Sequence, residues 1–314
     1  MKIGLALSGG GGKGSYQIGV WRALREFGLE PYICCVSGTS IGALNAVLFA
    51  QGNLELAETI WKSIREDQIF SLNLNWKKTH AITKLPNNYL KWVVSFLDRI
   101  AEHGWFSHAG LQKIIKENIN LSAVSSSPID LYATCFNISR WETEYFQLNT
   151  HTPKEIEQIL LASSALPLIF DQIIIKGNDY CDGGIGDNLP IQPVYESGAD
   201  IIIAVHLSRD SVINNKEAYQ NTKLIEIVPM ENQGGLFSGT LDFSIEGVKR
   251  RMEQGYHDTK QTLQPFYQFM KTQHEFIQQV QLFQEQAFLD ERKTLVEEKE
   301  LLKEELQQYI HKGR

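Results

Sequence analysis

The stretch Gly38-Thr39-Ser40-Ile41-Gly42 has the spacing of a nucleophile elbow. It follows a short apolar run and precedes a helix-like segment, which is the strand-to-helix context in which G-x-S-x-G holds a serine above a sheet. Glycine is needed two residues before and two residues after Ser40, because a Cβ atom in so sharp a turn would meet neighbouring backbone. Ser40 would stand at a helix N-terminus, which favours a developing negative charge. The pattern predicts a nucleophilic serine.

A glycine-rich segment, Gly9-Gly10-Gly11-Gly12-Lys13-Gly14, lies between a predicted strand and a predicted helix. Backbone amides in such a loop can bind negative charge. A dinucleotide would fit the G-x-G-x-x-G spacing, but the next strand does not end in the acidic residue that a ribose requires. A nucleoside triphosphate would need Ser or Thr where Gly14 stands. The oxyanion of a tetrahedral acyl intermediate is the third ligand, and the loop alone leaves oxyanion binding and a purely structural turn open.

A serine nucleophile needs a base, and His206 is the first candidate. It follows the apolar run 201–205 and would complete the order Ser, acid, His of the α/β-hydrolases. The elbow, however, follows only the second predicted strand, and the glycine loop precedes everything else. We therefore favour a structural hydrogen bond for His206 over a catalytic role.

Asp182 is the second candidate base. Gly183 and Gly184 follow it and allow a tight turn beside another backbone, although an ordinary β-turn explains the same residues. Asp187 is a third candidate within a turn-like sequence. The spacing of these carboxylates with Asp179 does not match a calcium loop, so the sequence predicts no metal site.

The elements that must position these groups alternate along the chain. A strand is predicted over 2–7, a helix from about residue 15 to residue 28, a strand over 33–36 and a helix over 41–50. This βαβα order predicts a parallel sheet covered by helices. The run 201–205 is apolar throughout and mostly β-branched, as expected of a strand covered on both faces. Further strands are predicted at 129–136, 144–148, 173–175, 201–207 and 224–228.

Two segments depart from this alternation. Residues from about 67 to 105 interleave aromatic residues with lysines, which fits core packing or a lid that contacts a membrane surface. From about Leu241 the pattern is helical, and after Pro265 the chain is rich in Gln, Glu and Lys. Two apolar series in this tail repeat every seven residues, which predicts one long helix or a helical hairpin. The series are Phe269, Phe276 and Phe283, then Phe288, Leu295, Leu302 and Tyr309.

We expect a main domain over 1–262 and a separate helical extension over 263–314. The extension either lies on its own domain or forms a coiled coil, through which the protein would associate as a homo-oligomer or dock a partner. The sequence leaves both open.

The composition of the chain argues against several classes of protein. The chain has 314 residues, 43% of them hydrophobic and 21% charged, with a formal net charge of −7. That charge is not the basic footprint of a nucleic-acid-binding protein. The four cysteines suggest neither a disulfide framework nor a zinc site. The N-terminal apolar stretch is short for a signal peptide, and no run approaches the ~18 apolar residues of a membrane span, so a cytoplasmic location is expected.

Four ordered blocks together resemble the patatin-like phospholipases. The likeness covers about residues 2–262, and Asn188-Leu189-Pro190 and Gly198-Ala199-Asp200 resemble the stretch that follows the catalytic aspartate of that family. One departure is Ser8, where plant members carry Asp and bacterial relatives often carry Ser. The blocks are 8–14, Gly38-Thr39-Ser40-Ile41-Gly42, Ala162-Ser163-Ser164-Ala165-Leu166-Pro167 and Asp182-Gly183-Gly184.

The resemblance implies an α/β/α sandwich with a mostly parallel sheet and a Ser–Asp dyad that hydrolyses acyl esters of lipids without a cofactor. Matched by position, Ser40 is the nucleophile, Asp182 is the base and Gly9, Gly10, Gly11 and Gly12 belong to the oxyanion-hole block. An aspartate near its ordinary pKa would accept the serine proton only as the new bond to the carbonyl carbon forms.

The expected substrate is a lipid acyl ester, hydrolysed as by a phospholipase A or lysophospholipase at a membrane surface. Lys13 is expected either as a solvated loop charge or as a contact to a lipid phosphate. A hypothesis from another class is a non-catalytic scaffold whose glycine loop binds a phosphate-bearing ligand and whose tail docks a partner.

Overall fold

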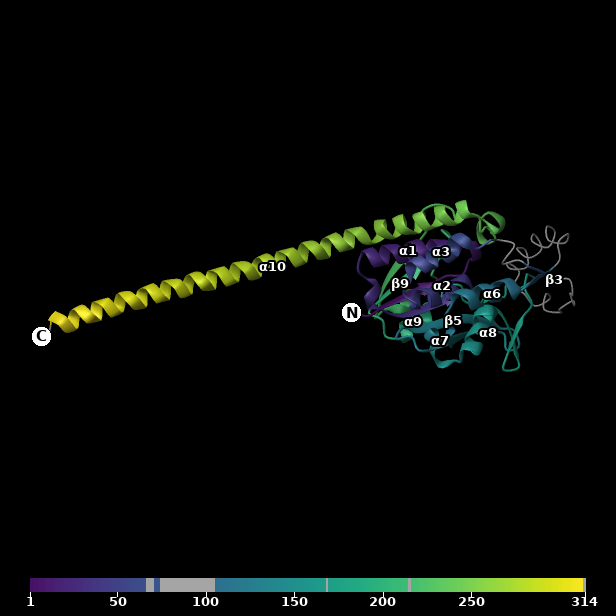
Figure 1. Cartoon of the computed structure of the whole chain (residues 1–314), viewed down its shortest axis with the longest axis horizontal. Helices are drawn as coiled ribbons and strands as arrows, with labels where there is room; N and C mark the ends of the chain where they lie inside the picture. The colour runs from purple at the N-terminus through teal and green to yellow at the C-terminus, as the bar shows by residue number, and fades with distance from the viewer. Residues whose placement is uncertain (66–70, 74–104, 168, 214–215, 313–314) are drawn as a thin grey trace. The chain divides into compact units, whose positions relative to one another are not determined.

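A mixed, mostly parallel sheet forms the centre of the first of two units into which the chain divides, Met1–Gln261 and Thr262–Arg314. The computed structural model describes residues 1–65, 71–73, 105–167, 169–213 and 216–312. In the first unit the strand order is β10-β9-β1-β2-β5-β8-β7, and β6 also pairs with β5 (Figure 1). This architecture confirms the α/β sandwich expected from the sequence.

Five neighbouring strands run parallel. Four parallel pairings join them in the order β10-β9-β1-β2-β5. Every residue of β1 is buried, as is nearly all of β9, because helices cover both faces of the sheet at its centre. These strands are β1 (Ile3–Leu7), β2 (Ile33–Thr39), β5 (Asp130–Asn137), β9 (Ile201–Val205) and β10 (Lys223–Ile227).

Three further strands join the sheet through antiparallel pairings, of β6 and β8 with β5 and of β7 with β8. They are β6 (Glu142–Gln147), β7 (Ile173–Ile175) and β8 (Asn178–Asp182). The sequence did not predict β8, because its residues are polar and resemble a turn. The residues of β8 have low strand propensity, and they form a strand because both neighbouring strands pair with them. β8 lies between β5 and β7, with Cys135 opposite Asp182 in the register. Asp182 is therefore the last residue of a strand rather than part of an isolated turn.

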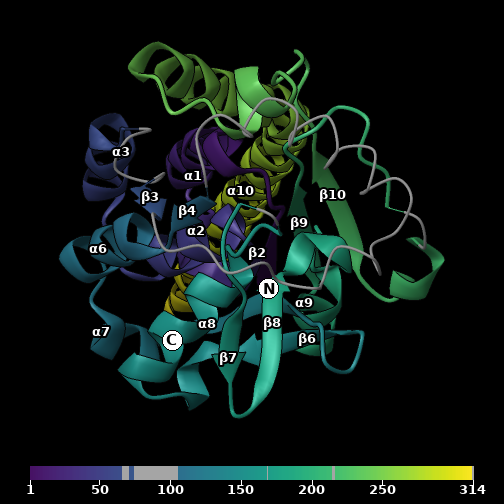
Figure 2. The same cartoon turned by 90° about the vertical axis from the view of Figure 1, so that its right-hand side faces the viewer.

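Helices cover the sheet from both sides. Helices α2 and α8 pack on one face and α9 packs on the other, as Figure 2 shows. The bounds are α1 (Ser15–Glu26), α2 (Ile41–Ala50), α3 (Leu54–Ser63), α6 (Ala109–Asn118), α7 (Leu121–Ser125), α8 (Pro153–Ser163) and α9 (Ile191–Glu196). Most of the predicted segment 67–105 lies outside the described residues. The short strands β3 (Ser71–Asn73) and β4 (Trp105–Ser107) pair antiparallel across it.

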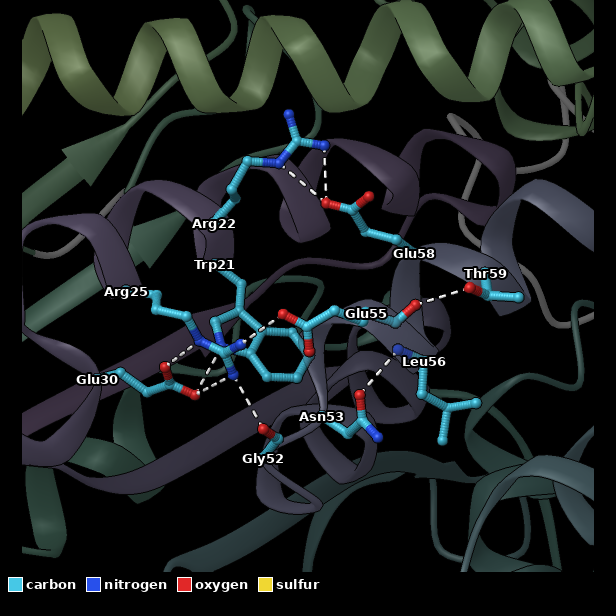
Figure 3. Close-up of polar contacts among 10 residues, drawn as sticks. All are labelled: Trp21, Arg22, Arg25, Glu30, Gly52, Asn53, Glu55, Leu56, Glu58 and Thr59. Carbon is cyan, nitrogen blue, oxygen red and sulfur yellow. Dashed lines mark hydrogen bonds and ion pairs between the residues drawn. The ribbon is translucent and has the colours of Figure 1, made fainter.

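A charged network joins α1 to α3 and to the entrance of β2 (Figure 3). The Arg25 guanidinium contacts Glu30 at 2.6 Å and Glu55 at 3.3 Å, and Arg22 contacts Glu58 at 2.7 Å. Single exposed ion pairs contribute little to stability, but several pairs that share two arginines form a partly buried network. The network links the helix after the glycine loop to the strand that ends at Ser40.

The tail is one helix rather than a hairpin. Helix α10 (Ile245–Lys312) continues through Pro265. The heptad-spaced side chains Phe276, Phe283, Phe288 and Leu295 are exposed, as is Leu302. Such a row on an exposed helix is typical of a coiled-coil seam, so homo-oligomerisation stays a prediction. No helix in the described ranges has both the length and the apolar character needed to cross a bilayer.

We predict that the double substitution Phe283→Glu and Leu295→Glu lowers the mass of the particle in solution to that of one chain. Charges in an apolar seam oppose helix pairing, and neither side chain is buried in the single chain, so the fold should survive. Light scattering coupled to gel filtration measures the mass. Lys293→Glu is the control, because it changes the charge equally outside the heptad series. An unchanged mass in the double variant would refute assembly through this helix.

Candidate active site

Ser40 occupies the sharp turn between β2 and α2. Its backbone has φ 56° and ψ −123°, a conformation that costs a non-glycine residue on the order of 1–3 kcal/mol. The glycine requirement predicted for this turn is confirmed. A Cβ at Gly38 would lie 2.2 Å from the carbonyl carbon of Gly42, and a Cβ at Gly42 would lie 2.3 Å from the Leu7 oxygen. The turn therefore brings Ser40 close to the end of β1 and the start of the glycine loop.

Ser163 holds the turn from the other side. The Ser40 amide donates to Ser163 Oγ at 2.9 Å, and Ser163 Oγ donates to the Thr134 carbonyl at 2.7 Å. Ser163 is fully buried at the end of α8, and Thr134 lies in β5. The block around Ser163 is visible in the sequence, but the pattern does not indicate the role of this hydroxyl. The Ser40 amide in this turn has no partner in a neighbouring strand, so it needs a side-chain acceptor. A hydroxyl fits this position because it accepts from the amide and also donates to the Thr134 carbonyl.

Asp182 ends β8 with a buried carboxyl group that is 2% exposed. Its Oδ1 accepts from the Gly184 amide at 2.8 Å, while Oδ2 has no hydrogen bond of ordinary geometry to the described residues. Burial raises the pKa of Asp182 to about 6, against the opposing effects of the nearby Ser40 hydroxyl and the Gly184 amide. The expectation of an ordinary pKa was wrong, because the sequence does not show that the strand end is desolvated.

Residues 187–190 connect the three motifs. The Thr39 hydroxyl, next to Ser40, donates to the Asp187 carbonyl at 2.8 Å. The Gly9 amide donates to the Asn188 carbonyl at 3.0 Å, and the Asn188 side chain returns a bond to the Gly9 carbonyl at 3.3 Å. The elbow, the glycine loop and the segment after Asp182 are thus held by direct hydrogen bonds. The sequence showed Asn188 only as part of a motif, because its partners lie far away in the chain.

The glycine loop packs closely against the segment that precedes α10. Gly11 has φ 55°, and a Cβ there would lie 2.1 Å from the Thr240 oxygen. A Cβ at Gly12 would lie 2.2 Å from the Asp242 oxygen. The Gly9 amide is already engaged by Asn188, whereas no hydrogen bond among the described residues engages the amides of Gly10 and Gly11. Two amide donors next to Ser40 are thus left available.

Two hollows meet at Ser40. A pocket of about 320 Å³ also contains Asp182, Lys13 and the loop glycines Gly9, Gly10 and Gly11. A smaller hollow of about 50 Å³ is almost wholly apolar. Its apolar lining comprises Ile41, Leu44, Leu111, Leu166, Phe170, Leu241 and Phe243. The serine therefore lines both a pocket with mixed polar and apolar walls and a smaller apolar hollow.

Lys13 lines the larger pocket. Burial and the neighbouring Arg251 cation both lower the pKa of Lys13. Over the described ranges, Lys13 forms no ion pair with an acidic residue, whereas Arg251 pairs with Asp242 at 2.5 Å. An ammonium group without a counterion beside the pocket would favour an anionic ligand group.

The other two candidate bases lie elsewhere. His206 Nε2 is 3.1 Å from Glu226 Oε2, which confirms the structural hydrogen bond expected for this residue. His206 does not line the pocket that contains Ser40 and Asp182. The Asp187 carboxylate accepts from the Tyr145 hydroxyl at 2.7 Å. Within the described part of the chain, no group of three or more His, Cys, Asp or Glu side chains has the arrangement of a metal site.

Comparison with known proteins agrees with this arrangement. A family model described as patatin-like phospholipase matches residues 5–195. The chain belongs to the patatin-like phospholipase family. The match begins in β1 and ends in α9, so it includes the glycine loop, the Ser40 elbow and Asp182.

Relatives within this family are distant and mostly longer. Lysophospholipase NTE1 of Mycosarcoma maydis is 31% identical over 206 residues, which are 65% of this chain and 10% of that protein. An NTE family protein of Mycobacterium bovis is 26% identical over 221 residues, covering 70% of this chain and 53% of the relative. The chain thus spans between about a tenth and about half of the length of these relatives. VipD from Legionella pneumophila shares the fold, with a TM-score of 0.53 at 17% identity over 84% of this chain and 67% of VipD.

We predict that Ser163→Ala destabilises the protein by about 1–3 kcal/mol, because it leaves the buried Ser40 amide and Thr134 carbonyl without their partner. Ser164→Ala is the matched control: its hydroxyl is equally buried but makes no hydrogen bond to the described residues, so its loss should not lower stability. Urea unfolding of both variants measures the difference. Equal stabilities of the two variants would contradict the role assigned to Ser163.

Proposed function

We propose that this chain is a serine lipid acyl hydrolase in which Ser40 is the nucleophile and Asp182 the base. The observation that carries the proposal is the placement of Ser40. Its strained turn lies in one pocket with a buried carboxyl group and with two amides that no hydrogen bond from the described residues engages. Nucleophile, base and oxyanion donors are the three parts that acyl transfer through a serine requires.

In the proposed reaction, Asp182 accepts the Ser40 proton as Oγ attacks the ester carbonyl carbon. The amides of Gly10 and Gly11 take up the charge of the resulting oxyanion, and the N-terminus of α2 adds a favourable field. The protonated Asp182 then gives its proton to the leaving alcohol. Water attacks the acyl-Ser40 ester and loses a proton to Asp182, which then gives that proton to Ser40 Oγ as the carboxylic acid is released. A base with a pKa of about 6 accepts a proton more readily than an ordinary aspartate.

The two chambers favour a lipid ester. The apolar hollow beside Ser40 suits the methylene groups of an acyl chain that adjoin the ester, and the larger pocket with Lys13 suits a phosphate-bearing alcohol. The name of the Mycosarcoma maydis relative, lysophospholipase, points in the same direction. We propose phospholipase A or lysophospholipase chemistry in the cytoplasm, at a membrane surface and without a metal. A scaffold that only binds phosphate would have no use for an apolar chamber at the serine.

We expect a fluorophosphonate probe to label the wild-type protein at Ser40 and Ser40→Ala to abolish labelling and esterase activity. Asp182→Asn should lower kcat by about 10²–10⁴, because the amide cannot accept the proton. The assay follows fatty acid release from a diacyl phospholipid, its lysolipid and a short-chain ester, with and without chelator. Asp210→Asn, which changes an exposed carboxylate outside both pockets at Ser40, serves as the control.

Full activity of Asp182→Asn would contradict the dyad. Tight binding of a phosphate-bearing ligand without any esterase activity, unchanged in Ser40→Ala, would instead identify a scaffold. Activity that chelator abolishes would refute a metal-independent mechanism.

We also predict that kcat/KM rises as the pH increases through about 6 and then reaches a plateau. Asp182 acts only when deprotonated, and burial has moved its pKa upward from the ordinary value near 4 to about 6. Initial rates on a soluble short-chain ester between pH 4 and pH 8 measure the profile. A rate that is already maximal at pH 4.5 would contradict the predicted pKa of the base.

A further inference from the structure

A second pocket of about 460 Å³ adjoins the one that contains Ser40. Gly184 and Asn188 line both, so the two pockets meet at the segment that follows Asp182. The second pocket has mixed polar and apolar walls, which include Ser8, Asp187, His206 and Tyr219. None of the catalytic steps proposed above uses these four side chains.

Two buried polar atoms in this pocket have no partner among the described residues. Ser8 is 2% exposed and His206 is 1% exposed, yet Ser8 Oγ and His206 Nδ1 make no hydrogen bond there. A carboxylate of Glu226 faces His206 Nε2, so the ring carries its proton on Nε2 and presents a lone pair at Nδ1. Burial lowers the pKa of His206, which keeps the ring neutral. The pocket thus offers an unused acceptor and an unused hydroxyl, groups that buried sites normally satisfy.

The charge of the pocket is negative. Asp187 is the ionised side chain in its described lining, which contains no Lys or Arg. Burial and the Asp187 carboxylate together raise the pKa of Tyr219. The carboxylate and the aromatic ring therefore lie near each other. Asp187 also keeps spare acceptor capacity, because its two oxygens receive only the Tyr145 hydroxyl and the Leu189 amide. A pocket that offers hydrogen-bond acceptors and one negative charge favours a cationic group that donates hydrogen bonds. It disfavours an anionic group such as a phosphate or a carboxylate.

We propose that this second pocket binds the primary ammonium head group of an ethanolamine-type phospholipid while its acyl ester lies at Ser40. This assignment rests on the proposed function. An ammonium group has three N–H donors for His206 Nδ1, Ser8 Oγ and the Asp187 carboxylate, whereas a choline group has none.

The order of the chambers matches the order of groups in such a lipid. The acyl chain would occupy the apolar hollow, the ester would lie at Ser40 and the phosphate would approach Lys13. The ammonium group would then lie beyond Gly184 and Asn188 in the second pocket.

The test measures dissociation constants by calorimetry, using monomeric ether-linked lysolipids that cannot be hydrolysed and that carry ethanolamine, choline or glycerol head groups. The wild type should bind the ethanolamine lipid about tenfold more tightly than the other two, as a charge-assisted hydrogen bond in a buried site implies. Asp187→Asn, which keeps the shape and the turn hydrogen bond, should remove most of this preference. Asp210→Asn is the matched control, because Asp210 is exposed and outside the pocket lining.

Ser8→Ala is a second variant, and we expect it to fold as the wild type does. The hydroxyl has no hydrogen-bond partner in the described part of the chain, so its removal should not lower the unfolding temperature. It should nevertheless weaken binding of the ethanolamine lipid several-fold while leaving the choline lipid unaffected. A purely structural Ser8 would show no such head-group dependence.

Each result separates the two proposals. Equal binding of all three head groups by the wild type, or a preference that survives Asp187→Asn, overturns the head-group site and leaves the hydrolase proposal intact. Free ethanolamine that binds as tightly as the lipid also overturns the assignment, since the pocket would then be an amine site independent of the lipid. A head-group preference without hydrolysis of any ester supports the pocket and contradicts the hydrolase.

Discussion

The backbone conformation of Ser40 is the constraint on which the site depends. A positive φ angle is unfavourable for a serine. Ser40 keeps this backbone conformation because the surrounding contacts hold it in place. The Ser163 hydroxyl receives its amide, and glycines on both sides permit contacts between main chains that any Cβ would prevent. The parallel sheet supplies the frame, because β1, β2 and β5 end at the same edge.

The electrostatics of the site follow from the same packing. Asp182 lies at the end of a strand whose pairing with β5 and β7 removes it from water, and the loss of hydration raises its pKa. The Gly184 amide satisfies one carboxyl oxygen and orients the group, while the other oxygen stays without a protein partner in the described ranges. Burial thus supplies both the basicity and the unsatisfied acceptor that a proton transfer from Ser40 would use.

Asn188 shows how one residue can serve several parts of the site. Its main chain and side chain both bond Gly9, its side-chain oxygen lies close to Gly184, and it lines both pockets. The Gly9 amide donates its hydrogen bond to the Asn188 carbonyl, so this amide is not available to bind an oxyanion. In the proposed reaction, Gly10 and Gly11 therefore supply the oxyanion donors, while Gly9 anchors the loop through its hydrogen bonds with Asn188.

Local pattern by itself determined the strand, loop and helix units around residues 3–50, the later apolar strands and the helical tail, because periodicity and glycine spacing are properties of neighbouring residues. It also pointed to Ser40 and Asp182. It missed β8, whose polar residues form a strand only by pairing with β5 and β7. It equally missed the functions of Ser163 and Asn188, and the pocket formed by Ser8, Asp187 and His206. Those depend on contacts between residues far apart in the chain, such as Asn188 and Gly9 at a separation of 179 positions, and on the exclusion of water by packing, which only the tertiary structure decides.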